Sequence, residues 1–152
     1  MNNLLIFILV SHIFLGILGI VFLTAYLLSF FKKNVSFGFL KRMSFFAFLS
    51  FVFSWISGGY YYVTYYGKAV KPVILKGDYF WVHKVLMETK EHIFLFLPFL
   101  SLTLFVITFF AGDGLTRDKK LSFATLALCF TTVSVALLVT IFGMVISGAV
   151  GK

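Results

Sequence analysis

Four long hydrophobic stretches follow one another along the chain, separated by short polar segments. They cover residues 4–31, 43–66, 93–111 and 121–150, and only His12 interrupts the first. Each stretch is long enough to supply the roughly 20 residues that cross a hydrocarbon core of about 30 Å. The pattern predicts an all-α polytopic membrane protein, with one four-helix transmembrane domain over residues 1–152 in an up-down bundle.

The predicted helices cover about residues 3–31, 43–66, 79–111 and 120–149. Asp78 is a good N-cap for the third helix, and Pro98 predicts a kink inside it. Because the third apolar run begins only at Ile93, the first part of this helix is expected to extend beyond the membrane, on the side of the long polar connection at residues 68–78.

Composition agrees with a membrane protein, because 61% of the residues are hydrophobic and only 12% are charged. Globular proteins carry about 25% charged residues. The first hydrophobic run exceeds the core of a signal peptide, about 7–15 residues, and no basic segment precedes it, so we expect it to be retained. The single cysteine, Cys129, excludes an intrachain disulfide and a cysteine-based zinc site.

The net charge of +8 comes from basic residues that are spread over the loops. This distribution favours anionic lipid headgroups over nucleic acid as the partner. Seven basic residues belong to the first and third loops: Lys32, Lys33, Lys41, Arg42, Arg117, Lys119 and Lys120. The positive-inside rule then places both termini outside, and we expect a plasma membrane of the bacterial inner-membrane type.

Glycines accompany the histidine of the first helix. Gly16 and Gly19 fall within about 40° of the face that carries His12, which leaves room for a flat group or another backbone. The alternative is an ordinary contact between helices through small residues. In the second helix, Gly58 and Gly59 also indicate close approach, and tyrosines follow that are typical of the membrane boundary: Tyr60, Tyr61, Tyr62, Tyr65 and Tyr66.

Ionisable residues gather at the start of the third apolar run. On a helix, Glu88, Glu91 and His92 share one face, and His83 and Met87 continue it. Such groups are costly to bury in a membrane and therefore indicate a functional site. The alternative is a solvated helical face, and for His83 an interfacial position, near a haem propionate or without any ligand, is expected.

Counting along the helices predicts that His12 and His92 lie at the same depth. Each stands nineteen residues from the end of its helix that adjoins the first or third loop, or roughly 28 Å at 1.5 Å per residue. Gly58 and Gly59 lie just below this level. Four helices would thus bring imidazoles and glycines into one layer near the outer leaflet.

This layer predicts a haem b between the first and third helices, with His12 and His92 as axial ligands. Gly16, Gly19, Gly58 and Gly59 would give it space. The expected apolar walls are Phe94, Phe96, Phe99 and Trp55. Ligation by two histidines leaves no open coordination position and therefore favours electron transfer, which we expect between a quinone-like donor and a partner protein. In general plan the chain resembles small four-helix membrane cytochromes b. At this size, a redox-complex subunit or a homodimer is expected.

Two other functions remain open. One is a non-haem iron, copper, zinc or manganese site that uses Glu88, Glu91 and His92 with His12 or His83. It departs from the di-iron pattern, since Thr89 replaces the glutamate three residues before His92. The other is a scaffold or accessory subunit of a membrane complex without a cofactor. No catalytic residue is predicted.

Overall fold

The computed structural model describes residues 2–32 and 36–149, so Lys33 and the ends of the predicted 1–152 domain lie outside the described residues. Within these ranges the chain is helical and contains no strand. Four helical stretches are long and apolar enough to cross a membrane: Asn3–Ser29, Phe37–Lys76, Val82–Ala111 and Lys119–Gly148. The prediction of an all-α chain with four such helices is confirmed.

Each long stretch is built from one or more helical elements. The first is α1 (Asn3–Ser29) and the last is α7 (Lys119–Gly148), which follows the short α6 (Gly114–Arg117). The second joins α2 (Phe37–Tyr61), the π-helical η1 (Tyr62–Val70) and α3 (Lys71–Lys76). The third joins the π-helical η2 (Val82–Met87), α4 (Glu88–Phe94) and α5 (Phe96–Ala111).

The second stretch is longer at both ends than its hydrophobic run predicts. It begins at Phe37 because the Ser36 side chain accepts a hydrogen bond from the Phe39 backbone, so the following basic residues lie inside the helix. It continues to Lys76 because Pro72 stands in the first turn of α3, where its missing N–H is tolerated. The polar connection predicted at residues 68–78 is therefore mostly helical.

The third stretch begins later than predicted and is broken once. Asp78 lies in a turn and does not cap a helix, and the stretch starts at Val82. The break falls at Leu95, between α4 and α5. Pro98 explains it, because proline has no N–H to donate to the carbonyl of Phe94 four residues earlier. The regular helical hydrogen bonding is thus interrupted one turn before the proline, while the Leu95 backbone stays in the right-handed helical region.

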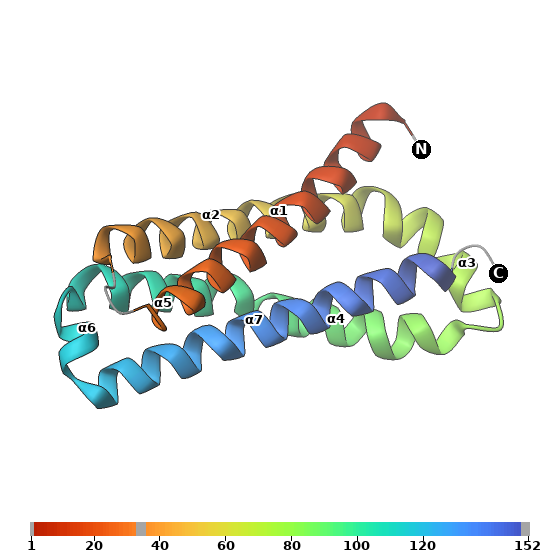
Figure 1. The fold of residues 1–152 in the computed structure, drawn as a ribbon. Helices are drawn as coiled ribbons and strands as arrows, with labels where there is room; N and C mark the ends of the chain where they lie inside the picture. The colour runs from red at the N-terminus through yellow and green to blue at the C-terminus, as the bar shows by residue number, and fades with distance from the viewer. Residues whose placement is uncertain (1, 33–35, 150–152) are drawn as a thin grey trace.

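The long helices pack in a ring, in which α1 contacts α2 and α7, and α5 contacts the same two helices (Figure 1). The start of α1 diverges from the other helices (Figure 1). The main buried cluster joins all four: Leu23, Tyr26, Leu40, Ala47, Phe51, Leu97, Leu104, Leu115, Cys129 and Ala136. The cysteine is therefore a packing residue of the core.

Small polar residues hold the helix interfaces. The Tyr26 hydroxyl and the Thr108 Oγ1 are 2.8 Å apart and link α1 to α5. Thr108 and Ser101 also donate to backbone carbonyls four residues earlier, so their hydroxyls are satisfied without water. In a membrane, where apolar surface alone does not separate core from surroundings, close packing of such residues drives association.

The contact between α1 and α2 is the most extensive in the protein. Gly19 makes it possible, since a Cβ at this position would lie 2.7 Å from Cε1 of Phe51. Phe51 is only 1% exposed, so its ring is held inside the bundle. The predicted space beside Gly19 is thus filled by a phenyl ring of the protein itself.

Gly19→Ala is expected to destabilise the protein by about 1–3 kcal/mol, because the new methyl group would push the Phe51 ring away from α1 and out of its present packing. Unfolding in detergent, followed by loss of helical circular dichroism, measures the change. Gly38→Ala is the matched control, because a Cβ there would meet nothing within 4 Å. Equal stability of the two variants would contradict this account of the α1–α2 contact.

Candidate functional site

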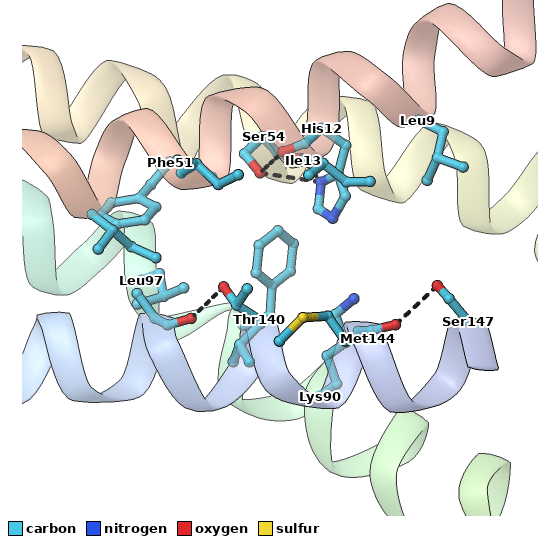
Figure 2. A pocket seen from close by; sticks show the side chains of 17 residues that line it. Leu9, His12, Ile13, Phe51, Ser54, Lys90, Leu97, Thr140, Met144 and Ser147 are labelled. Carbon is cyan, nitrogen blue, oxygen red and sulfur yellow. Dashed lines mark hydrogen bonds between the residues drawn. The ribbon is translucent and has the colours of Figure 1, made fainter. Parts of the chain in front are cut away.

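A cavity of about 360 Å³ lies between α1, α2, α4, α5 and α7 (Figure 2). Most of its wall is apolar. Its polar groups come from His12, Ser54, Lys90, Thr140 and Ser147. Thr140 donates to the Ala136 carbonyl and Ser147 to the Gly143 carbonyl, so both hydroxyls are satisfied within α7. The side chains left to interact with a ligand are those of His12 and Lys90.

Helix α2 holds the imidazole of His12 in one orientation. Nδ1 lies 2.8 Å from the Ser54 carbonyl oxygen and 3.1 Å from the Ser54 Oγ, which in turn donates to the His12 carbonyl. Because a carbonyl only accepts, Nδ1 carries the proton. The Nε2 side of the ring points into the cavity, and in the neutral imidazole Nε2 is a hydrogen-bond acceptor (Figure 2).

The imidazole ring of His12 is also packed between Gly58 of α2 and Phe94 of α4. A Cβ at Gly58 would lie 2.6 Å from Nδ1 and Cε1 of His12, so only glycine leaves room for the imidazole at this position. The Phe94 ring packs edge-on against it, with centroids 5.8 Å apart. The prediction that Gly58 gives close approach is confirmed, and the group that approaches is His12.

Lys90 enters the cavity from the opposite wall (Figure 2). Its Nζ lies over Gly143 of α7, where a Cβ would be only 3.2 Å away. Lys90 and His12 interact electrostatically across the space. Within the described ranges, Lys90 makes no hydrogen bond and no ion pair with a side chain or carbonyl. Lys90 therefore places an amino group in a mostly apolar cavity, where Glu91 interacts with it electrostatically but forms no ion pair with it in the described part of the chain.

The other predicted ligand, His92, lies outside this cavity. Its side chain is exposed, and its Nδ1 lies 2.6 Å from the Glu88 carbonyl on its own helix. Lys90 and Phe94 face the cavity, and each is two residues, or about 200°, away from His92. The imidazole therefore points away on the far side of α4, and the structure does not bring His12 and His92 together.

The acidic residues do not form the predicted metal centre either. Over residues 2–32 and 36–149, no three His, Cys, Asp or Glu side chains gather into a group that could hold a metal. Glu88 is exposed, and Glu91 turns its Oε1 inward. His83 is 2% exposed and its Nδ1 lies 3.0 Å from the Tyr66 hydroxyl, so it is buried among protein groups, and its expected position at the membrane interface stays a prediction.

The remaining predicted site residues separate into two groups. Gly16 lines the cavity, with Ser54 Oγ 3.5 Å from its ideal Cβ, whereas Gly59 faces open space. Phe94 is a wall of the cavity as expected. The other expected walls point outward and are exposed: Trp55 by 43%, Phe96 by 61% and Phe99 by 67%.

Lys90 is the cavity residue that the sequence analysis missed. Its spacing in the sequence could have identified it, because Lys90 stands four residues before Phe94, an expected wall of the site, and so shares its helical face. Met144 and Thr140 of α7, also on the wall, carry no signal in the sequence that separates them from other residues of that helix. Comparisons with protein-family models, curated proteins and solved structures find no match for the chain.

Gly58→Ala is expected to displace the His12 ring and break its bond to Ser54, because the new methyl group would overlap the imidazole. The ¹⁵N NMR signal of the His12 Nδ1 measures the effect, since a proton on this atom depends on the Ser54 carbonyl. Gly59→Ala, which meets nothing within 4 Å, should leave the signal in place. An unchanged signal in Gly58→Ala would contradict the observed packing.

Proposed function

We propose that this chain is a membrane-embedded binding protein, acting as a small accessory subunit or as a homodimer, that holds an amphiphile in the His12/Lys90 cavity. The head group carries an acidic oxygen, as in a fatty acid or a quinol. The observation that carries the proposal is the ammonium group of Lys90, which enters an apolar cavity and makes no hydrogen bond or ion pair with the described residues, although Glu91 interacts with it electrostatically. An unpaired cation is costly in such surroundings, and an anionic ligand oxygen removes that cost.

The two polar walls complement one such head group. The ammonium of Lys90 donates to an oxygen, and Nε2 of His12 accepts a proton or a hydrogen bond from the same or a neighbouring oxygen. The aliphatic part of the ligand would lie along the apolar wall, against residues such as Ile17, Ile20 and Leu97. This division into a few polar groups and a mostly apolar lining is typical of small-molecule sites.

The proposed setting is a bilayer that the four long helices cross alternately up and down. The connections between them are short, at residues 30–36, 77–81 and 112–118, which favours antiparallel neighbours. The end with seven basic loop residues would face the cytoplasm. The cavity, η1, α3 and η2 would then lie toward the outer face, with part of the third helix beyond the hydrocarbon.

Lys90→Met is expected to weaken binding of a fluorescent long-chain fatty acid about ten- to hundredfold, since a charged hydrogen bond contributes about 1.5–3 kcal/mol. Displacement from delipidated full-length protein in a non-ionic detergent measures the affinity. Lys84→Met is the matched control on an exposed position of η2, where Lys84 lies over Phe80. Equal losses in the two variants, or none, would contradict the site.

His12→Gln distinguishes the two head groups. A fatty acid binds as a carboxylate and depends on Lys90, whereas a quinol donates its hydroxyl proton and depends on the acceptor at Nε2 of His12. Loss of binding of a short-chain quinol, with fatty-acid binding retained, would identify a quinol site. Fatty-acid binding that is retained in His12→Gln and lost in Lys90→Met, in a protein that does not bind the quinol, would identify a fatty-acid site.

A haem b at His12 is the second candidate, and one observation favours it. A metal-binding histidine usually donates its other ring N–H to a carbonyl, as the Nδ1 of His12 does toward Ser54. Nε2 of His12 would then hold the haem iron. Because His92 lies on the far side of α4, a second protein ligand would come from Lys90 or Met144, which line the same cavity.

The optical spectrum of the purified protein tests this candidate. A Soret band that shifts on reduction, is lost in His12→Ala and persists in His92→Ala would support a haem held as described. Loss of the band in both variants would instead restore the pairing of His12 with His92. A colourless protein after expression with added haem precursor would remove the haem candidate and leave the amphiphile.

A further inference from the structure

A second polar cluster lies outside the cavity, where η1 faces η2. His83 is 2% exposed, and its Nδ1 is 3.0 Å from the Tyr66 hydroxyl, so the two π-helical segments are joined by a buried hydrogen bond. Tyr66 belongs to an apolar cluster, whereas His83 also interacts electrostatically with Lys71, Glu91 and Glu88. The other buried members of the cluster are Ile74, Val82, Met87, Ile146 and Ala149. Helical segments with π geometry often occur at functional sites.

Two buried polar atoms of this region lack a partner in the part of the chain that the structure describes: Nε2 of His83 and Oε1 of Glu91. Both residues come from the same long helical stretch, two turns apart, and Met87 lies between them. Buried polar atoms are nearly always hydrogen-bonded, and internal water commonly supplies the bond. Two such atoms on one face are therefore a place for bridging water.

The neighbouring groups can also exchange protons. The Tyr62 ring stacks on Tyr66, with centroids 5.3 Å apart, and Tyr62 interacts with Glu91. Glu91 in turn precedes His92 and follows Lys90, with which it interacts electrostatically. A carboxyl group, an imidazole and phenols thus connect the neighbourhood of the cavity to the tyrosines of η1. Ionisable groups in this arrangement inside membrane proteins commonly serve as proton relays.

We propose that Glu91, His83 and Tyr66 form a proton relay, completed by internal water between Glu91 and His83. The juxtaposition of a buried Tyr66–His83 pair with two inward-facing, unpartnered atoms carries the proposal. It does not depend on which ligand the cavity binds, because none of the three residues lines that cavity.

One transfer balances as follows. The Glu91 carboxyl group releases a proton to the water, which passes one of its own protons to Nε2 of His83. The Nδ1 proton of His83 moves to the Tyr66 oxygen as the Tyr66 hydroxyl gives its own proton to a second water molecule, and Glu91 takes a replacement proton from water. The imidazole ends neutral in its other tautomer, and one proton has moved without oxidation or reduction.

Glu91→Gln tests the relay through the exchange of the His83 ring N–H with water, measured by NMR on full-length protein with ¹⁵N-histidine in nanodiscs. The chain has three histidines, and His→Gln variants assign their signals. The exchange is expected to slow by about tenfold or more, the low end of what one positioned proton-transfer group contributes. Glu88→Gln, an exposed carboxyl group on the same helix, is the control and should retain the wild-type rate.

The direction of the change separates a relay from a structural role. If Glu91 only supports packing, its loss loosens the region and the exchange becomes faster, which would overturn the proposal, as would an unchanged rate. Glu91→Asp keeps a carboxyl group and is expected to exchange faster than Glu91→Gln. Equal rates in these two variants would also overturn the relay, because the carboxyl group would then have no part in the exchange.

Discussion

The close approach of α1 and α2 is the interaction on which the other features depend. Gly19 lies against Phe51, and Gly58 lies against the ring of His12. At both points of contact, one helix therefore has a glycine, which has no side chain, opposite a ring of the other helix. Ser54 then reaches both the imidazole and the backbone of α1. In a membrane these contacts cannot be replaced by burial of apolar surface, because lipid is as apolar as the core. The orientation of His12 is therefore a result of helix packing.

The hydrophobic pattern is sufficient to predict the helices but not where they end. An apolar run of about 20 residues has few alternatives to a membrane helix, because backbone groups must be satisfied internally. Charges do not end a helix, however, and Lys41 and Arg42 lie within α2. Pro72 is similarly compatible with the start of α3. A helix that is predicted to end at the first charged residue or proline is therefore shorter than the observed helix.

The height of a residue along its helix was easier to predict than the side of the helix on which its side chain lies. Counting residues placed His12 and Gly58 at similar heights, and they are in contact. Which side of α4 faces the bundle depends on rotation, and the break at Leu95 and the π-helical turns of η2 change the rotation of everything between them. A count through a regular helix cannot include these changes. Lys90 consequently faces the cavity, where His92 was expected.

The divergence of α1 at its start has a consequence for how the cavity is filled (Figure 1). This part of the helix is mostly exposed, with Phe7 at 69% and Phe14 at 59%, so in a bilayer hydrocarbon chains rather than water would adjoin it. An amphiphile of the proposed kind that entered between α1 and α7 would come sideways out of the leaflet. Its occupancy would then depend on its mole fraction among the surrounding lipids, and a weak intrinsic preference would be enough to keep the cavity filled if the compound were abundant in that leaflet.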